Sequence, residues 1–405
     1  MTGAARRVRE LTYAIREFCP LARELEKKGH RVIYMNMGDP ARWGFDVPRH
    51  VKEALCRAVG EGHNYYSPSQ GDEELRKAIA EKERAWNSVE VSPDDVYITF
   101  GVSEAIFIAL AALLNPGDEV LLPDPAYPLY VTYARLLEAK PRFYPCREET
   151  GWLPDISRIA RSIGPRTRAI VVINPNNPTG AVYSENNLRE ILDVAAERGL
   201  VVISDEIYDG LVLEGSFTSV ASVAKDVPVI GLNGLSKTFM MTGWRVGYLY
   251  LKLPDGYDWL RDAIRRLALS RLGVATPVQK AAITALRGPL DHLERFRSEL
   301  RKRRDLLLKL LDETGYFSVV KPRGAFYAFP RIEVRGPWKS DKEFVRELLL
   351  QEKVLVVHGS GLGKRGAWHI RLVYLPPPEV IGEAITRIGR FVRRCLGRKA
   401  AVGRL

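Results

Sequence analysis

The sequence predicts an α/β protein, in which a large domain with a mostly parallel sheet between helices is followed by a smaller α+β domain. β-branched runs alternate with helical patterns through the middle of the chain, as in sheets whose strands are joined by crossover helices. Several runs, such as AIVVI and LVVIS, are apolar on both faces, which is typical of a sheet covered on each side. The 405 residues are enough for more than one packed core.

Six segments of the large domain are predicted strands, because they are apolar, rich in β-branched residues and bounded by turn residues. They are residues 96–100, 119–122, 169–173, 200–204, 229–232 and 246–251. Helices fit between them. Residues 103–114 precede the helix-ending sequence NPG, and Glu185–Arg198 lies between a Ser184 cap and Gly199. These elements predict a doubly wound core.

The C-terminal third of the chain has a different pattern. Residues 290–311 are charged and amphipathic, which predicts a long hinge helix, and shorter strand candidates follow at 324–329, 354–357 and 369–373. We expect residues 1–48 to form an N-terminal arm and part of the small domain. Residues 49–289 would form the large domain, and 290–405 the hinge helix and small C-terminal domain. The polar, basic residues 1–12 are typical of a mobile arm.

Composition argues against several classes of protein. The net charge is +12, but apolar residues interrupt the basic runs at helical spacing, which indicates solvated helix faces and no nucleic-acid partner. No apolar run is long enough to cross a membrane, and the first residues lack the apolar core of a secretory signal. We therefore expect a cytoplasmic protein without a membrane partner. The four cysteines lie far apart, so no metal site is expected.

Three segments place reactive side chains at the ends of predicted strands. Lys237 and Arg245 lie in NGLSKTFMMTGWRVGY, Asn177 in NPNNPTG, and Asp205 and Tyr208 in SDEIYDG. Taken singly, these segments are also compatible with a surface lysine, a Pro/Gly turn and a helix cap. Because the carboxyl ends of parallel strands open into one crevice, we expect the three segments to share a site.

These side chains match the chemical requirements of pyridoxal phosphate. A buried carboxylate such as Asp205 would keep the pyridine nitrogen protonated, and Asn177 and Tyr208 would hydrogen-bond the phenolate oxygen. Burial and the nearby Arg245 would lower the pKa of Lys237, so that its amine can attack an aldehyde. Candidates for the phosphate and the ring face are Ser236, Arg245, the turn GVSEA at residues 101–105, and Tyr127 in DPAYP.

A longer ordered set of motifs carries a family resemblance. MNMGDP, NYYSPSQG, GVSEA, DPAYP, NPNNPTG, SDEIYD, SKTFMMTGWRVGY and HIRLVYL span residues 35–375. Together they resemble the class I aminotransferases of the pyridoxal-phosphate fold type I. Stretches such as GHNYYSPSQG, PVIGLNGLSK and VLVVHGSGLG are most similar to archaeal alanine aminotransferases. The resemblance implies that fold, a pyridoxal 5'-phosphate cofactor, and amino-acid and 2-oxo-acid substrates.

The resemblance also implies a role for each site residue. Lys237 would be the Schiff-base lysine and catalytic base. The cofactor would be held by Tyr127, Asn177, Asp205, Tyr208, Ser236, Arg245 and the backbone of Val102, Ser103 and Glu104. Tyr66 would reach the phosphate of the partner subunit's cofactor, which implies a homodimer with shared sites. The substrate carboxylate would be bound by Arg371, with Asn177 and the backbone at Gly38.

Some residues keep two interpretations. Without the resemblance, Arg371 is equally a surface arginine on a strand, and Phe326 in RGAFY either packs near the substrate or belongs to the core. Trp43 either narrows the pocket or packs against the small domain. His63 and His358 are given no catalytic role, because a histidine in a turn is more often structural.

The implied reaction moves the amino group of L-alanine to 2-oxoglutarate, which gives pyruvate and L-glutamate. The alternatives are broad, aspartate, branched-chain or aromatic specificity, or a lyase or decarboxylase on the same scaffold. A regulator that senses the cofactor is a further alternative. The short segment before the main domain contains no helix-turn-helix pattern, which argues against a regulator.

Overall fold

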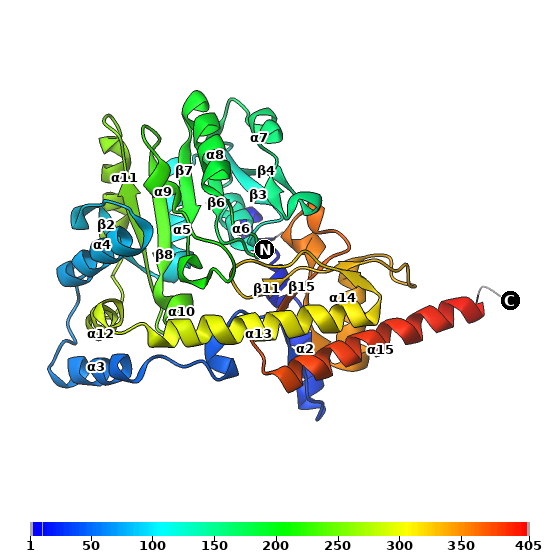
Figure 1. Ribbon diagram of the computed structural model, residues 1–405. Helices are drawn as coiled ribbons and strands as arrows, with labels where there is room; N and C mark the ends of the chain where they lie inside the picture. The colour runs from blue at the N-terminus through cyan, green and yellow to red at the C-terminus, as the bar shows by residue number, and fades with distance from the viewer. Residues whose placement is uncertain (1–2, 10, 403–405) are drawn as a thin grey trace.

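The computed structural model describes residues 3–9 and 11–402, and one eight-stranded sheet forms its centre (Figure 1). The strand order is β2-β9-β8-β7-β6-β3-β4-β5. The strands are β2 (Val96–Phe100), β3 (Glu119–Asp124), β4 (Lys140–Arg147), β5 (Leu153–Pro154), β6 (Thr167–Ile173), β7 (Val201–Asp205), β8 (Val229–Gly234) and β9 (Val246–Lys252). All six predicted strands of the large domain are therefore present.

The sheet is mostly parallel, as predicted. Strands β4, β3, β6, β7 and β8 pair in parallel, whereas β9 runs antiparallel to both β8 and β2. The expectation that residues 246–251 continue the parallel series is wrong, because the link from β8 returns beside β8 and contains only the short helix α10 (Leu235–Thr238). Strand β4 was not predicted, since its sequence KPRFYPCR combines two prolines with charged residues.

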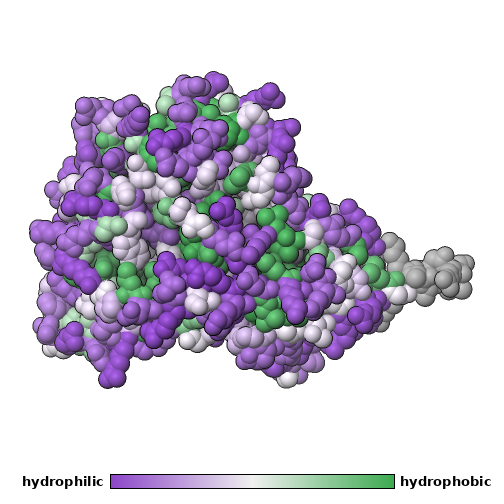
Figure 2. Space-filling view, in the orientation of Figure 1, coloured by the Kyte–Doolittle hydropathy of each residue, from purple (hydrophilic) through white to green (hydrophobic). Residues whose placement is uncertain are grey.

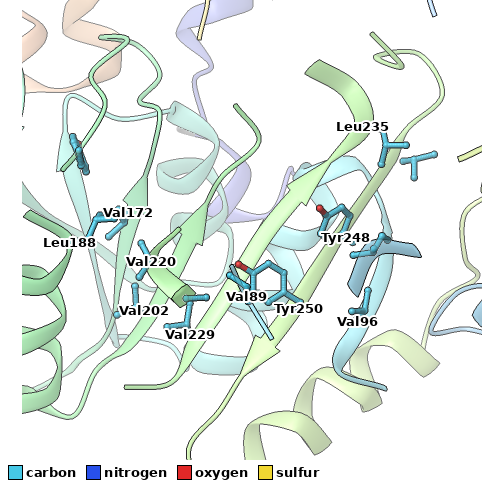
Figure 3. Packing of buried hydrophobic residues seen from close by; sticks show 14 of the residues in the cluster. Val89, Val96, Val172, Leu188, Val202, Val220, Val229, Leu235, Tyr248 and Tyr250 are labelled. Carbon is cyan, nitrogen blue, oxygen red and sulfur yellow. The ribbon is translucent and has the colours of Figure 1, made fainter. Parts of the chain in front are cut away.

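Helices cover both faces of the sheet, as predicted (Figure 1). One face packs on α5 (Gly101–Leu113), α6 (Pro128–Leu136) and α11 (Asp258–Leu269). The other packs on α3 (Arg49–Gly60), α4 (Glu73–Asn87), α7 (Ile156–Ser162), α8 (Glu185–Arg198), α9 (Val220–Val223) and α12 (Thr276–Arg287). Figure 3 shows the second face, where Val172, Val202 and Val229 from neighbouring strands lie near Leu188 and Val220.

Helix α8 shows how the local sequence sets an element's ends. The Ser184 side chain accepts a hydrogen bond from the Asn187 backbone, and the Asn187 side chain bonds back to the Ser184 backbone, which completes a capping box. At the other end Gly199 adopts φ 61°, a left-handed conformation that favours glycine. The predicted bounds of this helix are confirmed.

The remaining elements form a second packed region beside the sheet. The predicted hinge helix is α13 (Asp291–Thr314), which runs past both regions (Figure 1). The other elements are α2 (Cys19–Lys27), β1 (Ile33–Tyr34), β10 (Phe317–Ser318), β11 (Tyr327–Ala328), β12 (Arg331–Ile332), α14 (Asp341–Glu352), β13 (Val354–Leu355), β14 (Val357–His358), β15 (Ile370–Val373) and α15 (Pro378–Val402). Because β1 pairs with β13, N-terminal residues join this C-terminal region. The domain boundaries at residues 48 and 289 stay a prediction.

Short elements complete the described chain. They are α1 (Arg6–Arg9) and the 3-10 helices η1 (Ala14–Arg16), η2 (Pro40–Trp43), η3 (Pro93–Asp95), η4 (Glu148–Thr150), η5 (Asp209–Leu211), η6 (Gly359–Leu362) and η7 (Lys364–Gly366). The predicted mobile arm overlaps α1, and residues 1, 2 and 10 of it lie outside the described residues.

Hydrophilic residues cover most of the face shown in Figure 2, and apolar residues form small separate patches on it. Among the described residues, no helix combines the length and apolar character needed to cross a membrane. The same residues contain no cluster of His, Cys, Asp and Glu suited to a metal ion.

Candidate active site

A cavity of about 490 Å³ lies at the carboxyl edge of the sheet, between the two packed regions. The ends of β6, β7 and β8 and the start of α5 contribute to its wall, which is the usual place for a ligand crevice in an open α/β sheet. It brings together most of the predicted site residues: Gly38, Val102, Ser103, Tyr127, Asn177, Asp205, Tyr208, Ser236, Lys237, Arg245 and Arg371. The predicted convergence of the strand-end loops is confirmed.

Lys237 places its side-chain amine in the cavity. It lies in α10, directly after β8, and its Nζ donates a hydrogen bond to the Gly38 carbonyl oxygen at 2.6 Å. Burial lowers the pKa of Lys237 to about 8; the Arg245 and Arg371 charges act in the same direction, and Asp39 opposes them. The amine is therefore partly neutral near pH 8, as a nucleophile or base must be.

Gly38 approaches the site too closely for any side chain. A Cβ atom there would lie 2.3 Å from the Tyr327 hydroxyl and 2.6 Å from Cε2 of Phe326. The close approach allows the Gly38 carbonyl to face Lys237 while aromatic rings pack behind the backbone.

Asp205 supplies a buried carboxylate at the end of β7. Its Oδ2 accepts a hydrogen bond from the Tyr130 hydroxyl at 3.0 Å, and the Ile207 backbone N–H points to Oδ1 at 3.4 Å. Burial raises the pKa of Asp205 to about 6, although both hydrogen bonds act to lower it. A cationic group bound in the cavity would therefore strongly stabilise the charged form of this carboxylate.

Arg371 lies on β15 with only 1% of its surface exposed. Its Nη1 donates to Asn177 Oδ1 at 2.8 Å and its Nη2 to the Asn36 carbonyl at 2.6 Å, while the guanidinium stacks over the Tyr327 ring at 4.5 Å. Within the described chain Nε has no hydrogen-bond partner, and neither contact is with a carboxylate. A buried cation paired only with neutral groups is suited to binding an anion.

A second cationic group lies at the opposite part of the cavity wall. Arg245 adopts φ 60°, and its Nη1 and Nη2 bond to the backbone oxygens of Thr242 and Phe100. A Cβ atom on Gly101, which has φ 66°, would lie 2.4 Å from Nη2 of Arg245. Glycine thus lets the guanidinium contact the first turn of α5, whose N–H groups have no intrahelical partner. This combination is suited to binding an anion.

Tyrosines fill the wall between these groups. The Tyr208 hydroxyl lies 2.8 Å from the Tyr327 hydroxyl, and the Tyr13 hydroxyl donates to Tyr127 at 2.9 Å. Burial raises the pKa of Tyr208 well above its ordinary value, so this hydroxyl stays protonated and can donate to an oxyanion.

Two predicted residues are not brought to the cavity wall. The Glu104 carboxylate turns back to accept the Phe100 backbone N–H at 2.8 Å, which leaves its predicted backbone role untested. Tyr66 is 80% exposed and lies outside the cavity of this single chain, so its predicted contact across a dimer stays a prediction.

The residues with two interpretations are now placed. Phe326 is fully buried, and its ring lies 5.6 Å from Nζ of Lys237, so it belongs both to the core and to the site. Trp43 packs against the core of the second region. His358 bonds to Glu17 at 2.9 Å and His63 to the Tyr65 hydroxyl at 3.3 Å, and neither lines the cavity.

Comparison with known proteins decides the family. A model of the family described as "Aminotransferase class I and II" matches residues 31–388. The chain belongs to this family. Its fold matches the structure of an alanine aminotransferase from Pyrococcus furiosus with a TM-score of 0.94 and 51% identity, over 97% of this chain and 100% of that one.

Relatives with assigned names point the same way. Glutamate-pyruvate aminotransferase AlaA of Escherichia coli (strain K12) is 39% identical over 92% of this chain and 93% of its own. Aromatic-amino-acid aminotransferase 2 of Thermococcus litoralis is 36% identical over 94% of this chain and 95% of its own. The protein is thus an aminotransferase with relatives of more than one named specificity.

Sequence analysis missed several residues of this aminotransferase site. Tyr13 and Arg16 reach the cavity from the N-terminal segment, and Tyr327 lies beside Phe326 on β11. Tyr130 could have been found, because it follows Tyr127 by three residues on a helix and so faces the same side. Tyr13 has no such local signal, since only the tertiary fold brings it to Tyr127.

Replacing Asp205 should show how much its buried charge lowers the free energy of unfolding. Between about pH 4 and pH 6 folded Asp205 holds a proton that the unfolded chain releases, so its contribution to the free energy of unfolding falls as pH rises through this window. In protein stripped of small molecules, Asp205→Asn should therefore raise the free energy of unfolding at pH 8 by about 3 kcal/mol, at about 1.4 kcal/mol per pKa unit.

The difference between variant and wild type should vanish near pH 4, where the folded wild-type acid is neutral. Urea unfolding at pH 4, 6 and 8 measures it. A difference that is constant with pH would contradict the assigned cost of burying the charge.

Proposed function

We propose that the protein is a pyridoxal-phosphate-dependent alanine aminotransferase that transfers the amino group of L-alanine to 2-oxoglutarate. The observation that carries the proposal is the pairing of two groups in one cavity. Lys237 has a pKa lowered to about 8, and the buried Arg371 has an unpartnered Nε. An amine able to take a proton thus shares a cavity with a cation able to hold a carboxylate.

The residues present fit pyridoxal phosphate. Arg245, Ser236 and the first turn of α5 would hold the phosphate, and the contact between Arg245 and Gly101 supports this role. Asp205 would pair with the pyridine N–H, while Asn177 and Tyr208 would donate to the phenolate oxygen. Because Asn177 Oδ1 already accepts from Arg371, its amide N–H group is left to donate. Tyr127 would cover the ring face.

Bound there, the cofactor would supply an electron sink for the pair of electrons left on the substrate Cα. The chain's own residues do the rest. Arg371 would fix the α-carboxylate, with the Asn177 side chain and the backbone at Gly38, and so orient the Cα–H bond. The Lys237 amine would then remove the Cα proton as general base. Tyr327 lines this side of the cavity, and the buried Phe326 packs behind it.

Alanine is favoured as amino donor by the names of relatives that are 39% and 51% identical to this chain, which are alanine and glutamate-pyruvate aminotransferases. Aromatic specificity is the second candidate, because a relative of nearly equal identity is named for it. The side chains of alanine and of an aromatic amino acid differ in size, so they need different amounts of space beside the reacting carbon. Comparing the two amino acids as donors therefore separates the two candidates.

An absorption titration tests the amino donor. Cofactor-loaded protein is mixed anaerobically with L-alanine, L-aspartate, L-leucine or L-phenylalanine, without any 2-oxo acid. We expect L-alanine to bleach the visible cofactor band at the lowest concentration, and 2-oxoglutarate to restore it. A lower half-point for L-phenylalanine would establish the aromatic alternative. Continued product formation from the amino acid without any 2-oxo acid, with the visible band retained, would indicate a lyase or decarboxylase.

Removing the amine tests the catalytic assignment. Lys237→Ala should lower the rate of transamination by at least about 10²–10⁴-fold, the range expected for a lost general base, while the phosphate and ring contacts still bind the cofactor. Stopped-flow turnover and equilibrium dialysis measure the two effects. The exposed Lys225→Ala is the control for loss of a lysine. A Lys237→Ala protein that transaminates L-alanine at the wild-type rate would refute the assignment.

We further propose that the functional unit is a homodimer. Tyr66, Leu269 and Leu272 are 80%, 60% and 61% exposed, although large apolar side chains are rarely left in water together. Their segments are tied to each other, because the Arg271 guanidinium bonds to the Ser69 and Ile98 carbonyl oxygens. Strand β2 connects this surface to the cavity, because Arg271 bonds to Ile98 and Arg245 bonds to Phe100. A residue of a second copy would have to reach the cavity at this Arg245 end.

Sedimentation velocity tests the dimer. The wild type should sediment at twice the chain mass, and Leu272→Asp should give monomers with reduced activity, because a charge would be buried in the interface. Trp259→Asp is the matched control, since Trp259 is 51% exposed but lies at the opposite end of α11. A monomeric, fully active wild type would contradict the proposal.

A further inference from the structure

A buried polar cluster lies behind the cavity and contributes nothing to its lining. At its centre are Lys82 and Glu83 of α4 and Asp209 of η5, which are 6%, 0% and 6% exposed. Asn87, Asn233 and Tyr248 surround them and are equally buried. Figure 3 shows Tyr248 on β9, and its hydroxyl donates to Glu83 at 2.5 Å. The cluster joins α4 to the sheet at the level where β7 and β8 end.

Asp209 is the acceptor at the centre of this cluster. Its Oδ2 accepts from Lys82 Nζ, from Asn87 Nδ2 at 3.0 Å and from Asn233 Nδ2 at 2.8 Å, while Oδ1 accepts the Gly210 backbone N–H at 2.6 Å. Burial opposes charge on Lys82, but the Asp209 and Glu83 carboxylates outweigh it and raise the pKa of Lys82. The pair is therefore a buried ion pair with its polar neighbours in place.

The position of Asp209 in the chain links this ion pair to the site. Asp209 directly follows Tyr208, and its backbone N–H closes the turn that begins at β7 by bonding to the Glu206 carbonyl at 2.9 Å. Asn233 lies at the end of β8, four residues before Lys237. One carboxylate thus holds the loop that carries Asp205 and Tyr208 and also the segment that carries Ser236 and Lys237.

We propose that Asp209, with Lys82 as its counterion, is a positioning residue that sets the relative placement of Tyr208 and Lys237. The inference rests on the proposed function, in which both residues meet the same cofactor. Misplacement of a reacting group by about 1 Å can cost about 10²-fold in rate, so a rigid tie between two strand-end loops has a direct kinetic consequence. A buried ion pair is a poor source of stability because of its desolvation cost, yet it specifies one geometry.

Two neighbouring amides separate positioning from general stability. Asn233→Ala and Asn87→Ala each remove one hydrogen bond to the same Asp209 oxygen, but only Asn233 lies on the segment leading to Lys237. Each variant also loses a second hydrogen bond, because Asn87 donates to Glu83 at 2.6 Å and Asn233 Oδ1 accepts the Gly234 N–H at 2.7 Å, so the two should destabilise the protein to a similar extent. The readouts are the melting temperature, the pyridoxal-phosphate dissociation constant, the pH midpoint of the cofactor's visible absorption change, and kcat and KM for L-alanine.

We expect Asn233→Ala to move the pH midpoint by at least about half a unit and to weaken cofactor binding several-fold. It should also lower kcat about tenfold with little change in KM, as expected when a reacting group is misplaced. Asn87→Ala should lower the melting temperature and leave the midpoint and kcat within about twofold of wild type. Equal effects of the two variants on the midpoint and kcat would overturn the proposal and assign the cluster to stability alone.

The ion pair itself gives a second test. Lys82→Met and Asp209→Asn should each move the pH midpoint, and the double variant should be no worse than the more affected single variant, because the two residues act as one unit. If neither single variant folds, the double variant still reports the midpoint, because it removes both charges of the pair while Glu83 keeps its hydrogen bonds from Asn87 and Tyr248. Additive effects in the double variant would contradict the pairing. A wild type without any lysine-dependent cofactor band would instead refute the proposed function.

Discussion

The site depends on one topological constraint, which is that the parallel strands β6, β7 and β8 all end at the same edge of the sheet. The central residues of each strand are apolar and buried on both faces, so most of the polar side chains lie at or near the strand ends. Asn177, Asp205 and Lys237 follow three neighbouring strand ends and therefore meet in one cavity without any long-range adjustment. The helices on both faces hold these ends in place.

Burial then gives the converged side chains their chemistry. The same desolvation raises the pKa of Asp205 to about 6 and lowers that of Lys237 to about 8, because in each case the charged form loses its water. An acid that needs a cationic partner and an amine that is partly neutral are the two properties that an amino-transfer site requires. Arg371 remains charged and lacks a carboxylate partner, so it remains available for the substrate.

The second packed region completes the cavity from the other side. Arg371 on β15 and Tyr327 on β11 lie on paired antiparallel strands, while Gly38 and Asn36 follow β1, which pairs with β13. Of the proposed substrate groups, Arg371 and Gly38 therefore come from this region, whereas Asn177 and most of the proposed cofactor groups come from the sheet region. The hydrogen bond from Lys237 to the Gly38 carbonyl links the two regions.

Several features could be read from local sequence because their causes are local. The strand ranges follow from short apolar runs, the ends of α8 from Ser184 and Gly199, and the shared crevice from the rule that parallel strands end together. The order of motifs gave the family resemblance, which the comparisons confirm. Asp205 was found because it directly follows the predicted strand 200–204, and Lys237 because it lies in the short segment after the predicted strand 229–232.

The sequence by itself therefore determined the sheet, the family and the strand-end side chains, whose positions depend on neighbours within a few residues. Only the tertiary structure decided the antiparallel direction of β9, the approach of Tyr13 to Tyr127, the donation from Tyr130 to Asp205 and the burial of Lys82 against Asp209. These contacts join residues that are distant in the chain or depend on side-chain direction. Their free energy comes from packing and desolvation, and no pattern within one segment reports either.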